Sequence, residues 1–149
     1  MKPEEIMIYR EIQKNAEKAM KAIEVLEDKI YEEEFGMQIS RQALKYSDMR
    51  NRAVDRLLSA KAEPVHVNYL NDAIQRGSIH MNTLFNTSTG HIAELMIEGS
   101  NRGMVSVLKV LKQNNRGNSA GVMTSMATEM AEEFMRFEEK NVEIMKKYL

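Results

Sequence analysis

Three histidines and several glutamates are the residues of this chain that could bind a metal or transfer protons. The histidines are His66, His80 and His91, and the chain contains no cysteine. Zinc fingers, thiolate chemistry and disulfide frameworks are therefore excluded. No serine forms a recognisable catalytic pair with a histidine, and no glycine-rich loop ends in the Lys-Ser or Lys-Thr step that binds phosphate. Metal binding through histidine and glutamate remains as the main candidate chemistry.

A di-iron or di-manganese site in a helical bundle needs a Glu-x-x-His motif on each of two helices and a glutamate on each of two others. The sequence has one Glu-x-x-His order, Glu63-Pro64-Val65-His66. Because proline breaks a helix interior, these two side chains cannot share one helical face. We interpret this order as a chance match.

A non-standard iron or manganese site around His91, Glu94, Glu98 and Glu138 stays open. The first three recur at steps of three and four, so they share one side of a helix and could also hold a metal between subunits. Helical phase places Glu94 and Glu98 away from the apolar stripe, and it places Glu138 about 70° to the side of its own stripe. We therefore expect no carboxylate in the middle of the bundle, because burying one without a partner is costly. The alternative for His91 and Glu94 is a partly exposed pair beside a helix N-terminus.

A run of four small residues lies inside one predicted helix: Gly99, Ser100, Gly103 and Ser106. A glycine in a helix interior costs about 1 kcal/mol relative to alanine, so a close contact should compensate for it. Small residues one turn apart let a helix, a bulky side chain or a ligand approach the backbone. We expect an aromatic side chain of the next helix, such as Phe134 or Phe137, to fill this notch. A dimer contact and an apolar ligand are the alternatives.

Methionine is unusually frequent, with 13 residues in a chain that has no tryptophan. Methionine fills irregular gaps in a core and also suits adaptable binding surfaces. Most of these residues fall on predicted apolar stripes, which favours a core role. Met126, Met135 and Met145 border or leave the stripe of the last helix, and an exposed patch there would indicate self-association or a hydrophobic partner.

The elements that must position these residues are all helical. The chain has two prolines, and its apolar residues recur at alternating steps of three and four among strong helix formers. Pro3 suits the start of the first helix, Gly36 suits its end, and Asn118 or Ser119 suits the N-cap of the last one. The predicted helices cover about 3–34, 37–60, 89–113 and 118–148, with a crossover over 62–88 that has a short helical stretch near 67–76.

Two helices joined by a short turn, a long crossover, and two more helices joined by a short turn are the connectivity of a four-helix bundle with one crossover. That is the ferritin-like arrangement. Acidic residues dominate 3–35 and 118–149, whereas basic residues dominate 37–61 and 89–117. We expect these charges to lie on solvated faces and to favour the pairing of neighbouring helices.

The composition is that of one soluble domain over residues 1–149. With 21 basic and 22 acidic residues, the chain offers no general attraction to nucleic acid or to anionic membranes. The arginines of 37–60 form no aligned stripe beside stacking rings, which also argues against nucleic acid. No apolar run approaches the roughly 20 residues of a membrane span. The amphipathic N-terminal stretch lacks the apolar centre of a signal peptide, which favours the cytoplasm.

A sequence resemblance is carried by three runs: IHMNTLF at 79–85, STGHIAELMIEGS at 88–100 and FEEKN at 137–141. They resemble a group of ferritin-like four-helix-bundle proteins of anaerobic, Clostridium-like bacteria. The likeness covers the end of the crossover and the last two helices. It implies a ferritin-like fold and a cytoplasmic bacterial protein, and it implies no activity.

These observations together predict a non-catalytic bundle that acts as a self-associating interaction or binding module, with a homodimer as the expected assembly. A first alternative is a metal-dependent oxidoreductase or iron-binding protein that uses iron or manganese at His91, Glu94, Glu98 and Glu138. A second alternative is a carrier of a small apolar ligand in the notch between Gly99 and Gly103.

Overall fold

Four long helices and one short turn account for the regular structure of the described residues. The computed structural model describes residues 1–66, 88–116 and 125–149, and this part of the chain contains no strand. The all-α prediction is confirmed. The elements are α1 (Pro3–Leu26), η1 (Glu27–Lys29, one 3₁₀ turn), α2 (Glu33–Ser59), α5 (Thr89–Arg116) and α6 (Met126–Lys146).

The first helix ends earlier than the sequence predicts. It stops at Leu26, the chain becomes extended at Ile30, and α2 begins before Gly36, whose N–H donates to Glu32 O at 2.9 Å. The predicted end of the helix at Gly36 is therefore wrong. The break places Glu33 and the following glutamate in the first turn of α2, where the helix dipole favours carboxylates, instead of at a helix C-terminus.

The starts of α5 and α6 are both capped by serine. Ser88 Oγ accepts a hydrogen bond from His91 N at 3.2 Å, and Ser125 Oγ accepts one from Thr128 N at 3.1 Å. α5 continues through Arg116, three residues beyond its predicted end. The predicted cap of the last helix at 118–119 and the predicted short helix at 67–76 lie outside the described residues.

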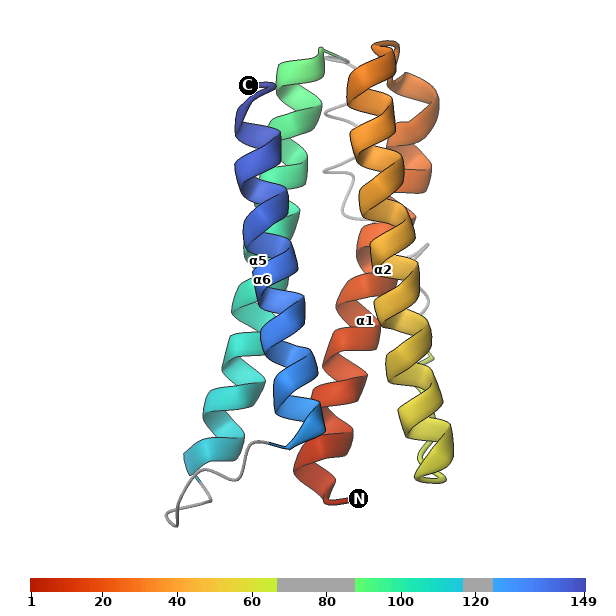
Figure 1. Cartoon of the computed structure of the whole chain (residues 1–149), viewed down its shortest axis with the longest axis vertical. Helices are drawn as coiled ribbons and strands as arrows, with labels where there is room; N and C mark the ends of the chain where they lie inside the picture. Colours follow the sequence, from red (N-terminus) through yellow and green to blue (C-terminus); the bar gives the residue numbers. More distant parts are fainter. Residues whose placement is uncertain (67–87, 117–124) are drawn as a thin grey trace.

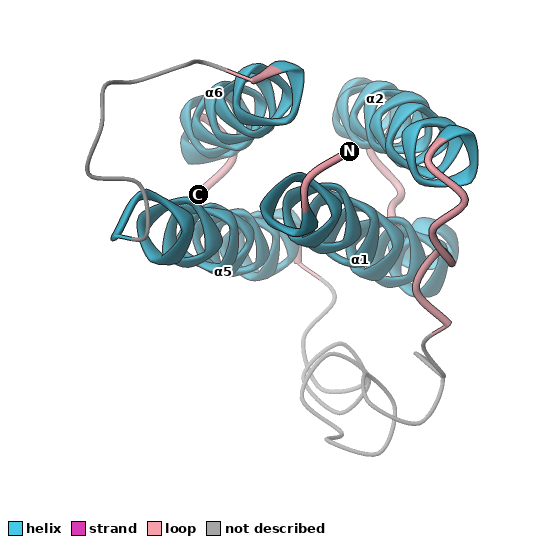
Figure 2. Ribbon diagram, turned by 90° about the horizontal axis from the view of Figure 1, so that it is seen from below, coloured by secondary structure: helices cyan, strands magenta, loops and turns pink. Residues whose placement is uncertain are grey.

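The helices are arranged as two antiparallel pairs, α1 with α2 and α5 with α6 (Figure 1). Seen along the helices, α1 lies beside α5, and α2 lies beside α6 (Figure 2). α2 and α5 run in the same direction, so the end of α2 and the start of α5 lie at opposite ends of the molecule.

The core lies between all four helices and follows the predicted apolar stripes. Each helix contributes side chains that are almost fully buried, among them Ile12, Ala16, Tyr46, Met49, Leu57, Ile92, Val107, Met130 and Phe134. Their burial supplies most of the stability, at about 25 cal/mol for each Å² of apolar surface removed from water.

Charge also links the helices, as the sequence predicts for the first two. Arg50 of α2 pairs with Glu17 of α1 at 3.0 Å. Glu133 of α6 accepts contacts from two residues of α2, Arg52 at 2.8 Å and Lys45 at 3.2 Å. α2 therefore uses its basic residues toward both neighbours. Over the described residues, no helix is both long and apolar enough to span a membrane.

Candidate functional site

The centre of the bundle holds a cluster of polar side chains that we call the Glu138 cluster: Tyr46, Ser100, Glu138 and Asn141. Tyr46 comes from α2, Ser100 from α5, and the other two from α6. Glu138 is 2% exposed, and the other members are buried as well. Glu138 and Asn141 lie three residues apart, so both project from the same face of α6. Polar contacts therefore join three helices inside an otherwise apolar core.

One carboxylate oxygen of Glu138 accepts three of the four hydrogen bonds that define this cluster. Tyr46 donates its hydroxyl to Glu138 Oε1, and Ser100 Oγ and Asn141 Nδ2 donate to the same oxygen at 3.3 and 3.2 Å. Asn141 Nδ2 also donates to the Tyr46 hydroxyl oxygen at 3.2 Å. The ring of Tyr46 packs edge-on against Phe137, with ring centroids 4.8 Å apart, and this packing helps to hold the hydroxyl at the carboxylate.

The surroundings of Glu138 shift its titration to neutral pH. Burial raises the pKa of the Glu138 carboxyl to about 7, and the hydrogen bonds from Tyr46, Asn141 and Ser100 oppose this rise. Burial, together with the nearby charge of Glu138, raises the pKa of Tyr46 well above its usual range. The cluster can therefore take up or release one proton near neutral pH while Tyr46 stays protonated.

The expectation that no carboxylate points into the bundle is wrong, because Glu138 does so. Two features compensate for its burial. Donors from α2 and α5 reach Oε1, and Gly103 leaves room for Oε2. Neither feature can be read from the periodicity of α6, since both belong to other helices. Tyr46, the main donor, carries no sequence signal beyond its place on an apolar stripe.

The small residues of α5 explain how the carboxylate fits. A Cβ on Gly103 would overlap Glu138 Oε2 and would lie 3.6 Å from Phe134 Cε1. The predicted close approach of Phe134 is confirmed, and a carboxylate joins it. Ser100 belongs to the Glu138 cluster. The remaining members of the run are less buried: Gly99 and Ser106. The chain's own side chains thus occupy the Gly103 side of the predicted notch.

The structure brings together one pair of the four predicted metal ligands. His91 Nδ1 lies 3.7 Å from Glu94 Oε2 at the start of α5. Glu98 is exposed one turn further along, whereas Glu138 is in the core. Among the described residues, no three histidine, aspartate or glutamate side chains form a group that could hold a metal ion. A metal site shared between subunits stays a prediction.

The Glu-x-x-His order at 63–66 lies in an irregular segment after α2, so its two side chains share no helical face. Buried Gln13 of α1 holds this segment. Its Nε2 donates to Val65 O at 3.1 Å, and its Oε1 accepts from Val65 N at 2.8 Å. His66 is exposed, and His80 lies outside the described residues.

Gln42 adds a further polar side chain to the core. It lies one turn before Tyr46 on the buried face of α2. Neither its amide nitrogen nor its amide oxygen has a hydrogen-bond partner within the described ranges. Gln42 and Tyr46 therefore place polar groups in two successive turns of the buried face of α2. Of these groups, only the Tyr46 hydroxyl forms hydrogen bonds with side chains of another helix.

The solvent side of α2 carries a line of residues at seven-residue spacing that we call the outer row: Met37, Leu44, Asn51 and Leu58. Seven residues are nearly two helical turns, so these side chains lie almost above one another. Leu44 is 73% exposed, Leu58 58% and Met37 51%. The buried residues of α2, such as Tyr46, lie on the opposite side. α2 therefore carries three exposed apolar side chains among polar ones on the side that the other described helices do not cover.

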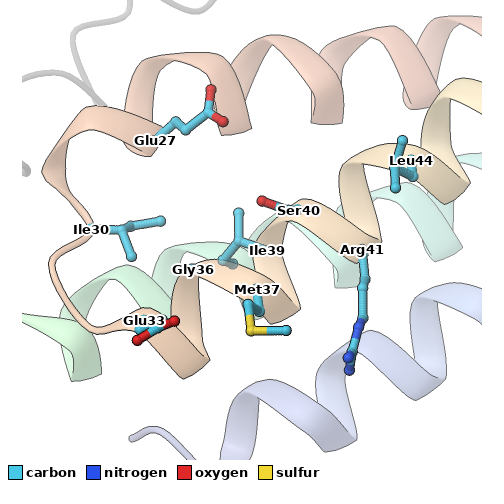
Figure 3. Close-up of a pocket in the computed structure, with 9 residues that line it drawn as sticks. All are labelled: Glu27, Ile30, Glu33, Gly36, Met37, Ile39, Ser40, Arg41 and Leu44. Atoms are coloured by element: carbon cyan, nitrogen blue, oxygen red, sulfur yellow. The ribbon is translucent and has the colours of Figure 1, made fainter.

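A surface hollow of about 430 Å³ lies at the first half of the outer row (Figure 3). Met37, Ser40 and Leu44 of α2 line it, together with Ile30 from the segment before α2. Gly36 also lines the hollow, and a Cβ at this position would make only an ordinary contact with Ile30 at 3.5 Å. Glu27, Glu33 and Arg41 line it as well, so its wall is partly apolar and partly charged.

The methionines of α6 do not form the exposed patch that would have indicated a partner. Met126 is exposed, but Met135 is partly buried, and Met145 is fully buried. The prediction for Met145 is wrong, because Met145 lies one turn after Asn141 and shares its buried face of α6.

The order Gly117-Asn118-Ser119-Ala120-Gly121 fits the Gly-x-Ser-x-Gly pattern of hydrolases. In those enzymes the serine sits where a strand turns into a helix. The described residues contain no strand, and 117–121 lies outside them. The pattern therefore carries no assignment here.

Two features of the described residues stand out for function: the Glu138 cluster inside the bundle and the outer row on its surface. The cluster offers one titratable group whose hydrogen bonds come from the chain itself, and the outer row offers an apolar contact surface. In comparisons with known proteins, the chain matches no family model, no curated protein and no solved structure.

Proposed function

We propose that this chain is a non-catalytic helical bundle that acts as a self-associating interaction module. The observation that carries the proposal is the outer row of α2, whose Met37, Leu44 and Leu58 are exposed along one line. Single exposed apolar residues are common on soluble proteins. Here three of them recur at nearly the same helical phase of one helix, with polar residues between them. Fully burying a leucine side chain contributes about 1.5–3 kcal/mol, so a partner that covers this row gains from each of them.

The fold that we propose for this module is ferritin-like. Its support is the direction of the helices: α1 with α2 and α5 with α6 are antiparallel, and α2 and α5 run in the same direction. This order matches a four-helix bundle with one crossover. The resemblance of 79–100 and 137–141 to bacterial ferritin-like proteins agrees with it, and it favours a cytoplasmic protein.

The absence of catalysis is part of the proposal, and the Glu138 cluster supports it. A catalytic carboxyl must reach a substrate, whereas Glu138 is 2% exposed and its Oε1 accepts hydrogen bonds from Tyr46, Ser100 and Asn141. These contacts suit a structural role. The cluster fixes the relative rotation of three helices, because each donor must face the same oxygen.

The metal alternative draws its support from the pair of His91 and Glu94, 3.7 Å apart. It needs further ligands, and a second subunit would have to provide them. The apolar carrier alternative needs an open notch beside Gly103, where Glu138 and Phe134 already lie. The outer row needs neither addition, and we therefore prefer self-association.

Sedimentation velocity over a wide concentration range tests the proposal. We expect the wild type to form dimers as the concentration rises and Leu44→Glu to stay monomeric, because a charge would enter the apolar contact. Leu108→Glu is the matched control, since Leu108 is an exposed leucine on α5. It should dimerise like the wild type. A wild type that is monomeric at every concentration contradicts the proposal.

A further inference from the structure

We infer that the outer row binds the outer row of a second copy of this chain, with the two α2 helices antiparallel about a two-fold axis near Ser47 and Asp48. This inference rests on the proposed function and specifies its surface and orientation. A two-fold axis uses the same patch on both copies, so the patch must be complementary to itself. The apolar residues of the outer row meet this condition, and so do two charged residues that flank it.

The apolar residues match when the two helices run antiparallel. With the axis near Ser47 and Asp48, Met37 lies at the height of Leu58 of the second copy. Leu44 then lies at the height of Asn51 of the second copy. The small Ser40 beside the row leaves space between the protruding side chains, in the manner of knobs and holes. Each large side chain of one copy thereby reaches the other copy.

The hollow beside the first half of the row gives one of these contacts a defined place. It has a volume of about 430 Å³, and Met37, Leu44 and Ile30 form the apolar part of its wall, beside the charged Glu27, Glu33 and Arg41 (Figure 3). In the antiparallel arrangement, Leu58 of the second copy lies at the height of Met37 and can enter this hollow. The two-fold axis creates the same contact at the other end of the interface.

Two exposed charges decide between the antiparallel and the parallel orientation. Arg41 and Asp55 each lie four residues after a member of the outer row, so both flank it on the same side. Both are exposed, and neither forms an ion pair within the described residues. In the antiparallel arrangement, Arg41 of each copy lies near Asp55 of the other. In a parallel two-fold arrangement, the Arg41 side chains of the two copies lie on opposite flanks of the contact, and so do the Asp55 side chains, so neither charge meets a partner.

Asp48 lies on the same side of the row and close to the two-fold axis, where it would approach Asp48 of the second copy. Its charge is already compensated within each chain. Arg52 Nη1 lies 3.4 Å from Asp48 Oδ2, and Lys45 Nζ lies 3.8 Å from it. The axis therefore does not bring two uncompensated charges together.

The size of the contact predicts a weak dimer. α2 has 27 residues and is about 40 Å long. One pair of helices of this length covers less surface than a standard stable interface, which places such a contact among the transient ones. We expect a dissociation constant in the micromolar range. Reversing the charge of Arg41 or Asp55 should change this constant by a measurable factor.

Charge reversal tests the inference in a way that the self-association experiment does not. Arg41→Glu places two acidic pairs in the homodimer, and Asp55→Arg places two basic pairs there. We expect each variant alone to dimerise about tenfold more weakly than the wild type. An equimolar mixture of the two restores both opposite-charge pairs and should dimerise like the wild type. Arg136→Glu, an exposed charge reversal on α6, is the matched control and should change nothing.

The outcomes separate the two proposals. Recovery in the mixture supports the antiparallel surface. If the wild type dimerises but the single variants do not weaken it, or if the mixture stays weak, the surface or its orientation is wrong and self-association stands. If the wild type does not dimerise at all, the proposed function fails. Far-ultraviolet circular dichroism of each variant shows whether it is folded, so that unfolding is not taken for loss of contact.

Discussion

Leu44 and Tyr46 lie two residues apart in α2, yet their surroundings are opposite. The polar hydroxyl of Tyr46 is in the core, where it donates to Glu138, whereas the apolar side chain of Leu44 is 73% exposed. A buried polar group is stable when its hydrogen bonds are satisfied inside the chain, and Glu138 Oε1 meets this condition. The exposed apolar row has no such compensation from the residues that the structure describes. The difference teaches that the burial of Glu138 is explained by contacts within the fold, whereas the exposure of Leu44 is not.

A change of pH should cause the largest change in the free energy of unfolding that we expect. The folded pKa of Glu138 is about 7, against an ordinary value of 4.5, so the folded chain binds the proton more tightly than the unfolded chain. The free energy of unfolding should therefore fall by about 3 kcal/mol as pH rises from below 4.5 to above 7. Urea unfolding at pH 5 and pH 8 measures the difference over most of this window.

Glu138→Gln is the control for that pH dependence, because it keeps an acceptor oxygen and cannot ionise. The variant should lose the fall in stability and should be more stable than the wild type at pH 8. Hydrogen bonds from Arg52 hold the pKa of Glu133 at about 2, so this carboxylate adds little slope above pH 5, and that slope is the same in both proteins. An equal fall in wild type and variant would show that Glu138 is not the group responsible.

The glycines of α5 give the next largest effect, in opposite directions. Gly103→Ala would put a methyl group against Glu138 Oε2 and should destabilise the fold by about 1–3 kcal/mol. Gly99→Ala meets nothing within 4 Å, so the gain in helix propensity should stabilise the fold by about 0.5–1 kcal/mol. Thermal unfolding of both variants checks this pair. Equal effects of the two changes would mean that Gly103 does not serve the carboxylate.

Removal of the tyrosine hydroxyl tests the hydrogen bond between Tyr46 and Glu138 directly. Tyr46→Phe takes away one donor to Glu138 Oε1 and should cost about 1–3 kcal/mol. Because the hydrogen bond from Tyr46 lowers the pKa of Glu138, this pKa should rise further in the variant. Carbon-13 NMR of the glutamate carboxyl against pH measures the shift. Tyr9→Phe is the control, since no described residue is hydrogen-bonded to the Tyr9 hydroxyl; the same shift in both variants would disprove the contact.

The smallest effect concerns metals. Calorimetric titration of metal-stripped protein with Fe(II) or Mn(II), without oxygen, should show no binding at micromolar affinity, because the chain as a single unit brings together only His91 and Glu94 of the predicted ligands. Binding of two equivalents for each chain, lost in His91→Ala, would instead support an iron-dependent or manganese-dependent protein. The outer row would then have to be explained separately.

The sequence predicts the helices and the apolar stripes because both depend on local propensity and on spacing within one element. It also predicts the approach of Phe134 to Gly103, since a glycine in a helix interior needs compensation. It does not predict the burial of Glu138, because this burial depends on a hydroxyl and a missing Cβ supplied by other helices. The spacing of Met37, Leu44 and Leu58 is visible in the sequence, but only the fold shows which face of α2 the bundle leaves uncovered.

Methyl NMR of a dilution series tests the central claim, self-association through the outer face of α2, most directly. We expect the methyl signals of Leu44 to shift with concentration along a dimerisation curve, while those of Leu108 on α5 do not move. Constant signals for both leucines, or a shift confined to Leu108, would contradict it.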